Sequence, residues 1–165
     1  RYPMAPEGTL GLPISAGKLA YPRNRFAIAT SPHGIFVLGG YRGGFPYSYD
    51  DSVERLMWSE GAPQLISQMQ PRMPSRRGGH AAVTVGDHLI VVGGYTGFHH
   101  LDRIDVAIIN PNGELSDWRQ AGTLKEPRSN LAVAVQGGNL YVLGGGSTAG
   151  LSSAVEVIPL KQLGL

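Results

Sequence analysis

Three stretches decide the fold: Ile35-Phe36-Val37-Leu38-Gly39-Gly40, Leu89-Ile90-Val91-Val92-Gly93-Gly94 and Leu140-Tyr141-Val142-Leu143-Gly144-Gly145. In each stretch four apolar residues lead into a glycine pair, and the pairs are 54 and 51 residues apart. A nearly fixed period of this size indicates that one structural unit has been copied along the chain. The repeat therefore predicts the architecture before any single site is considered.

The residues around each glycine pair follow the same order in all three copies. Sixteen residues before the pair stands an arginine, which is Arg23, Arg77 or Arg128. A run of small residues and a turn follow, and these are the signals of a hairpin between two short strands. After the pair, a loop of varied length leads to a third strand that carries an acid: Glu54, Asp105 or Glu156.

A fourth strand is predicted in the second unit. The turn Asn110-Pro111-Asn112-Gly113 precedes a segment from Glu114 to Gln120, with Leu115 and Trp118 as its apolar anchors. One unit is thus four antiparallel strands in about fifty residues. The second strand is apolar on both faces, which predicts burial between neighbouring sheets.

This pattern resembles the kelch repeat of β-propellers. The resemblance rests on Pro22-Arg23 and Pro127-Arg128 before the first strand, on the glycine pairs, and on Trp118 in the fourth strand. It implies an all-β, kelch-type β-propeller with three four-stranded antiparallel blades. Structural roles are expected for the residues that recur or anchor a blade: Gly39, Gly40, Gly93, Gly94, Gly144, Gly145, Arg23, Arg77, Arg128 and Trp118.

The blades are expected to be cut between their third and fourth strands. The third unit stops after its third strand, whereas Gly8-Thr9-Leu10 aligns with Gly113-Glu114-Leu115 at an offset of 105. We therefore expect one array over 1–165. Its parts are a fourth strand of a shared closing blade (1–22), blade 1 (23–71), blade 2 (72–124) and the first three strands of blade 3 (125–165).

Three blades do not close a ring, because propellers have about 4–8 blades. An open half-ring would expose two apolar sheet faces. We expect a second copy of the chain to complete a six-bladed ring with twofold symmetry. The alternative is that the missing blades come from a longer polypeptide or from a different subunit.

Composition excludes several classes of function. The chain of 165 residues has no cysteine, so disulfides and thiol chemistry are excluded, as are the copper-radical oxidases that share the kelch propeller. No membrane span is expected, since no run of 18 apolar residues occurs. The net charge of +2 without a basic stripe predicts no nucleic-acid partner. The first residues lack a signal-peptide core, so the compartment is unknown.

The loops between blades and the loops after each second strand are expected to open on one face, here called the loop face. It comprises roughly residues 20–25, 40–51, 70–79, 94–103, 124–130 and 145–153, with nine basic and four acidic residues, a net +5. Cations together with aromatic rings suit anionic or flat polar ligands. The contact residues predicted on this face are Arg25, Arg42, Tyr47, Tyr49, Arg76, Tyr95, Phe98 and His99.

Two interpretations compete for these residues. The recurring Arg23, Arg77 and Arg128 are expected to pair with the acids of the third strands, whereas the four non-recurring arginines of the loop face are candidates for binding or plain solvation. The Tyr41–Asp51 insertion is either a recognition loop or a packed loop. No metal site is expected at His99-His100, because no third ligand is suitably spaced. His80 is expected to be a packed strand residue.

The sequence predicts a non-catalytic interaction module that binds a protein, peptide or anionic partner through the loop face and needs no cofactor. One alternative is a carbohydrate-binding propeller that resembles the bacterial sialic-acid mutarotases, with arginines on the carboxylate and tyrosines on the sugar. Another is a structural subunit that docks on a larger complex. Fold alone does not choose between them.

Overall fold

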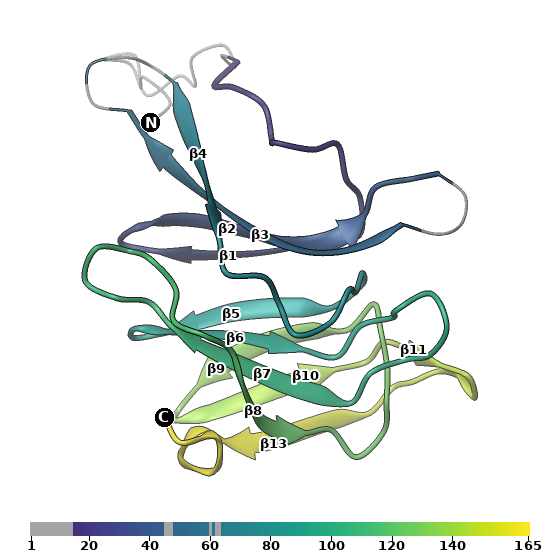
Figure 1. Cartoon of the computed structure of the whole chain (residues 1–165). Helices are drawn as coiled ribbons and strands as arrows, with labels where there is room; N and C mark the ends of the chain where they lie inside the picture. Colours follow the sequence, from purple (N-terminus) through teal and green to yellow (C-terminus); the bar gives the residue numbers. More distant parts are fainter. Residues whose placement is uncertain (1–14, 45–47, 60, 62–63) are drawn as a thin grey trace, which may run out of the picture.

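The computed structural model of the chain describes residues 15–44, 48–59, 61 and 64–165. Its strands form three main antiparallel sheets, which lie one after another in chain order (Figure 1). The first sheet has the order β1 (Ala27–Ser31), β2 (Gly34–Tyr41), β3 (Tyr49–Trp58), β4 (Leu65–Gln70). The second has the order β5 (Ala81–Val85), β6 (His88–Val92), β7 (Arg103–Ile108), β8 (Arg119–Thr123).

The third sheet contains β9 (Ala132–Gln136), β10 (Asn139–Leu143) and β13 (Val155–Pro159), with β10 in the middle. A two-residue ladder of β11 (Gly146–Ser147) and β12 (Gly150–Leu151) lies in the loop before β13. The chain ends in a short 3₁₀ turn, η1 (Leu160–Leu163), which the sequence did not predict. The expected all-β fold of antiparallel blades is confirmed, and the sheets form part of a propeller that is not closed.

Apolar side chains fill the two gaps between successive sheets. Between the first and second sheets, Phe36 and Leu38 of β2 pack with Leu89 and Val91 of β6. The second gap is filled in the same way by residues of β6, β7 and β10. This explains why β6 is apolar on both faces, since one face packs on the first sheet and the other on the third.

The glycine pairs sit where successive sheets approach most closely. The Gly40 amide donates to the Arg77 carbonyl of the next sheet at 2.9 Å, and the Gly94 amide donates to the Arg128 carbonyl at 2.9 Å. The preceding Gly39 has φ +54°, and a Cβ added to it would lie 2.7 Å from the Arg77 carbonyl oxygen. Glycine is required here both for its left-handed backbone and for the space.

Two strand boundaries differ from the sequence predictions. The fourth strand of the second sheet begins at Arg119 rather than Glu114, because Leu115 turns into the core between the first and second sheets and is buried there. The third strand of the first sheet begins at Tyr49, so Asp50 and Asp51 belong to β3 and not to the preceding loop. Residues 15–22 contain no strand, and the remainder of the predicted closing strand, 1–14, lies outside the described residues.

Candidate functional site

The arginine that recurs in each unit is buried against the acid of its own sheet. Arg77 and Asp105 are both 0% exposed, and the Arg77 Nη2 lies 2.6 Å from the Asp105 carboxylate. The Arg128 guanidinium lies 2.7 Å from Glu156, and the Arg23 guanidinium lies 3.4 Å from Glu54. Burial lowers the pKa of Arg77 from its usual value, while the Asp105 carboxylate acts in the opposite direction. These pairs hold the loops in place and are not open to a ligand.

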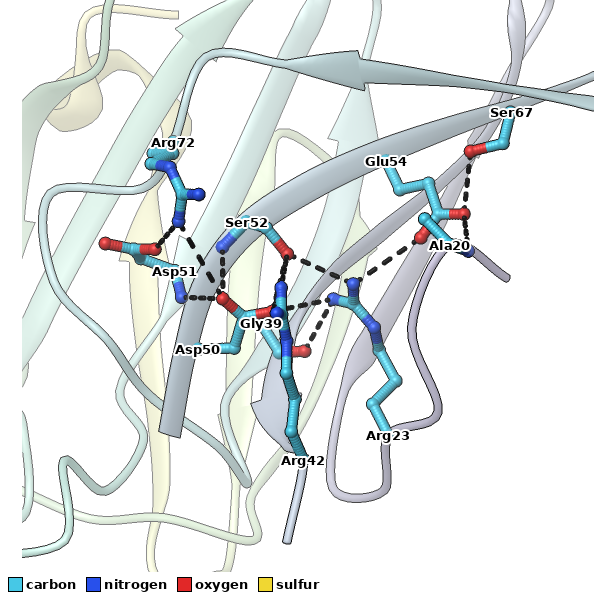
Figure 2. Close-up of polar contacts among 10 residues, drawn as sticks. All are labelled: Ala20, Arg23, Gly39, Arg42, Asp50, Asp51, Ser52, Glu54, Ser67 and Arg72. Atoms are coloured by element: carbon cyan, nitrogen blue, oxygen red, sulfur yellow. Dashed lines mark hydrogen bonds and ion pairs between the residues drawn. The ribbon is translucent and has the colours of Figure 1, made fainter. Parts of the chain in front are cut away.

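The loop face of the first sheet contains a larger polar network centred on Asp50 (Figure 2). The Arg42 Nε donates to the Asp50 carboxylate at 2.6 Å, and the Ser52 hydroxyl donates to it at 2.6 Å. Arg23 approaches the same carboxylate at 3.5 Å, while Arg72 pairs with the neighbouring Asp51. Figure 2 shows Arg23 and Arg42 reaching the network from neighbouring segments.

The protonation of Asp50 follows from this network. Burial by itself would raise the pKa of Asp50, but the Ser52 hydroxyl and amide, followed by the Arg42 guanidinium, outweigh burial and hold the pKa below its usual value. Asp50 therefore stays ionised at neutral pH and neutralises Arg42. The Arg42 guanidinium also stacks 3.7 Å from the centre of the Tyr21 ring. Any anionic ligand of Arg42 would have to compete with Asp50.

Ion pairing reduces the cationic character of the loop face. Six of its nine basic side chains form ion pairs with Asp or Glu. Within the part of the chain that the structure describes, the cations of this face without an ion pair are Arg25, Arg76 and Lys125. All three are exposed. The charge available to a ligand is thus smaller than the net +5 from counting residues.

One of these free cations, Arg25, lies in a pocket of about 310 Å³ where β1, β5 and β9 begin. The lining combines a cation, aromatic rings and small polar groups: Arg25, Tyr49, Gly78, Tyr95, Phe98, His100, Ser129, Asn130 and Thr148. The Tyr49 and Tyr95 rings meet edge to face at 5.7 Å, and Tyr95 lies 4.9 Å from the His100 ring. Phe98 is 93% exposed beside them.

The backbone of Arg25 is unusual for a residue with a side chain. Its φ is +53°, in the left-handed region that costs a non-glycine residue about 1–2 kcal/mol. The equivalent residues in the next two units are Gly79 and Asn130, which adopt this conformation more easily. Backbone hydrogen bonds connect the three residues one after another. The Gly79 amide donates to the Arg25 carbonyl at 2.8 Å, and the Asn130 amide donates to the Gly79 carbonyl at 2.6 Å.

The structure brings four of the predicted contact residues together in this pocket: Arg25, Tyr49, Tyr95 and Phe98. Tyr49 is mostly buried and offers only part of its ring. His99 lines a second pocket of about 350 Å³, which shares His100 and Thr148 with the first. Arg42 and Arg76 line neither pocket. Tyr47 lies outside the described residues.

Sequence reasoning did not select His100, Asn130 or Thr148 as pocket residues. The register of the repeat would have found Asn130, because it is the third-unit equivalent of Arg25. His100 becomes visible only through its ring contact with Tyr95. Among the described residues, no group of three or more His, Asp or Glu side chains could hold a metal ion. The same part of the chain has no helix of the length and apolarity that crossing a bilayer requires.

Comparison with known proteins gives consistent matches. Residues 76–107 match the Kelch motif family. The chain is 29% identical over 133 residues to a tRNA wybutosine-synthesizing protein 2/3/4 of Arabidopsis thaliana, covering 78% of this chain and 13% of that protein. It is 26% identical over 140 residues to Kelch-like protein 41b of Danio rerio, covering 82% and 21%. The chain therefore spans only a small part of these curated relatives.

A solved structure shares the fold. The structure of YjhT superimposes with a TM-score of 0.65 at 16% sequence identity, and the match covers 86% of this chain and 47% of that one. At this identity the likeness concerns the fold alone. The described sheets correspond to about half of the matched chain.

Proposed function

We propose that this chain is a non-catalytic interaction module, because it belongs to the kelch-repeat β-propeller family. Its partner contacts the Arg25 pocket on the loop face. Kelch repeats generally mediate protein–protein interaction. The observation that carries the proposal is Arg25 itself. It is exposed, forms no ion pair within the described residues, and occupies a strained backbone conformation where the equivalent residues are Gly79 and Asn130.

The chemistry of the pocket supports an acidic peptide segment as the ligand. A guanidinium binds a carboxylate through charge-assisted hydrogen bonds, which are stronger than neutral ones. The Tyr95 and Phe98 rings give flat surfaces for the flanking side chains or backbone. Ser129, Asn130 and Thr148 add short polar groups that can accept or donate to a peptide backbone.

Arg25→Gly is expected to weaken binding of an acidic peptide at least about tenfold, because a charge-assisted contact is worth about 1.5–3 kcal/mol. The probe is a fluorescein-labelled peptide of alternating Asp or Glu and Gly, measured by fluorescence anisotropy. Thermal unfolding of Arg25→Gly is expected to be unchanged or shifted upward, since glycine relieves the backbone strain at φ +53°.

Two controls make this experiment specific. The same peptide with Asn and Gln in place of the acids is expected to bind weakly to every variant. Arg72→Ala removes another exposed arginine of the loop face that lies outside the pocket, and it is expected to bind the acidic peptide as the unaltered chain does. If Arg25→Gly binds as tightly as the unaltered chain, the assignment of the pocket is wrong.

A carbohydrate with a carboxylate is the second candidate ligand. It is favoured by the exposed Phe98 ring and by Tyr95 beside a free arginine, an arrangement that can stack a sugar ring and hold its acid. Free N-acetylneuraminic acid in a thermal-shift assay separates the two candidates. A shift with the sugar that disappears in Arg25→Gly, without peptide binding, would favour the carbohydrate.

A further inference from the structure

The second pocket, here called the Glu126 pocket, continues from the Arg25 pocket along the loop face. It has a volume of about 350 Å³ and shares His100 and Thr148 with the Arg25 pocket, so the two hollows lie next to each other. Glu126 and Pro127, which follow β8, form part of its wall. A ligand longer than a single residue can therefore occupy both hollows, with His100 and Thr148 between them.

The two hollows offer opposite charges. Within the described residues, the exposed Glu126 carboxylate forms no ion pair and no hydrogen bond, and it does not pair with Arg25. Of the other acids of the loop face, Asp50 and Asp51 pair with arginines, and Asp102 lines neither hollow. The joined site thus has a free cation in one hollow and a free anion in the other.

The fold itself makes no use of the Glu126 carboxylate. The equivalent residue in the second unit is Ser75, whose hydroxyl accepts hydrogen bonds from the recurring Arg77 at 2.7 and 3.1 Å. Glu126 forms no such bond with Arg128, although the Nε atom of Arg128 has no hydrogen-bond partner among the described residues. The carboxylate is therefore available to a ligand.

The neighbouring Lys125 does not neutralise Glu126 by pairing with it. Lys125 lines a separate hollow between β8 and β13, and its backbone amide donates to the Glu156 carboxylate at 2.9 Å. No ion pair joins the Lys125 and Glu126 side chains, both of which are described by the structure. The negative charge of the Glu126 pocket is thus not cancelled by its neighbour in sequence.

Two short turns hold the walls of the joined site in place. The Thr96 hydroxyl accepts the His99 amide at 3.2 Å in the loop that follows β6. The Ser147 hydroxyl accepts the Ala149 amide at 3.1 Å in the turn that carries Thr148. Ordered walls favour binding, because less conformational entropy is lost when a ligand arrives.

We propose that the joined site binds a peptide segment that carries an acidic side chain and, within a few residues of it, a basic one. The acid pairs with Arg25 and the base pairs with Glu126. This inference rests on the proposed function, since it takes Arg25 as the receptor of the acid, and it adds the requirement for a base. Charge complementarity of this kind contributes more to the choice of partner than to affinity. A uniformly acidic segment would place a like charge beside Glu126 and bind less tightly.

Peptide pairs that differ at one residue test the proposal by fluorescence anisotropy. Each fluorescein-labelled peptide has one Asp in a Gly and Ser background, and a second charge, Lys or Glu, two, three or four residues away. The unaltered chain is expected to bind the Lys peptide about threefold to tenfold more tightly than the Glu peptide at one or more spacings, because pairs between exposed side chains are weak. Equal binding of the Lys and Glu peptides at every spacing would overturn the proposal.

Glu126→Lys is the decisive variant, with Asp117→Lys as its matched control. Both residues are exposed acids in segments that flank β8, and Asp117 lines neither hollow. The two variants change the net charge of the chain equally, so long-range attraction of the peptides changes by a similar amount. Glu126→Lys is expected to reverse the preference, so that the Glu peptide binds more tightly, whereas Asp117→Lys keeps the preference of the unaltered chain. An unchanged preference in Glu126→Lys would overturn the proposal.

Folding is checked by thermal unfolding, which is expected to be the same in both lysine variants because both side chains are exposed. If Glu126→Lys fails to fold, Glu126→Gln takes its place and is expected to lower the preference for the Lys peptide at least about twofold. A preference that persists in full in Glu126→Gln would overturn the proposal.

Arg25→Gly separates this inference from the proposed function. It is expected to weaken the Lys and Glu peptides alike, because both carry the Asp. If it does so while Glu126→Lys leaves the preference unchanged, the acid-binding pocket stands and the requirement for a base is wrong. If Arg25→Gly weakens neither peptide, the proposed function is wrong and this inference is wrong with it.

Discussion

Replacing Asp105 with alanine is expected to lower the free energy of unfolding by about 3–5 kcal/mol, because it leaves a buried guanidinium without its counter-charge. Arg77 is 0% exposed, and among the described residues it keeps the Ser75 hydroxyl and the Gly93 carbonyl as partners once Asp105 is lost. Since domains of this size are stable by about 5–15 kcal/mol, the loss is a large part of the total. Urea unfolding followed by circular dichroism measures it.

The control is Arg72→Ala, which removes an ion pair with Asp51 from a side chain that is 63% exposed. Pairs at the surface contribute about 0–1 kcal/mol, so the control should scarcely move the unfolding midpoint. The double variant Asp105→Leu with Arg77→Met is expected to recover most of the loss, since it removes both buried charges together. Arg103, which also pairs with Asp105, is 31% exposed and keeps its contact with water. Equal effects of Asp105→Ala and Arg72→Ala would contradict the view that burial sets the strength of these pairs.

His80 is expected to make the chain less stable in mild acid. The ring is fully buried, which lowers its pKa to about 3, with the neighbouring Arg77 acting in the same direction and the Leu38 backbone weakly opposing. Within the described residues, no hydrogen bond of normal geometry reaches either ring nitrogen. The unfolded chain takes up a proton near pH 6.5, whereas the folded chain does not until about pH 3. The contribution of a neutral, buried His80 to the free energy of unfolding is therefore fully present above pH 6.5, and it decreases as the pH falls toward 3.

Because of His80, the free energy of unfolding is expected to fall by about 2 kcal/mol between pH 7 and pH 5. The linkage relation gives about 1.36 kcal/mol for each pH unit below the pKa of the unfolded state. His80→Leu should remove this part of the slope, because Leu131 fills the same register in the third unit and is buried. The lowered pKa of Asp50 acts in a separate window, since its contribution is present above the unfolded pKa of about 4 and is lost only below it. Identical slopes for the two chains between pH 7 and pH 5 would show that His80 takes up its proton in the folded state.

The glycine pairs and apolar strands of the fold could be predicted from the sequence because they recur at a nearly fixed spacing. Gly39, Gly93 and Gly144 mark the ends of three apolar strands, and their spacing indicated three copies of one unit. The type of blade came from the resemblance to the kelch repeat. The predicted start of the fourth strand in the second unit was wrong because the prediction took Leu115 as a strand residue. An apolar residue just before a strand has the same sequence pattern as one within it. In the structure Leu115 anchors a loop in the core between two sheets.

The candidate site was harder to predict from the sequence, because a ligand-binding arginine and an ion-paired arginine have the same sequence pattern. Arg42 and Arg25 both appear as non-recurring arginines in loops. Asp50, which was placed in the loop by sequence, starts a strand and neutralises Arg42, so only Arg25 of the two remains free. Such pairing depends on neighbours in space, and no spacing rule within the repeat specifies it.

At both junctions between the described main sheets, the amide of the second glycine donates to the carbonyl of the recurring arginine, and this bond acts as a connector between units. A duplication of the coding segment for one unit would therefore add a blade that joins its neighbours without any new contact having to arise. Growth and loss of blades would then change the size of a propeller in whole units, because each added unit carries its own connector.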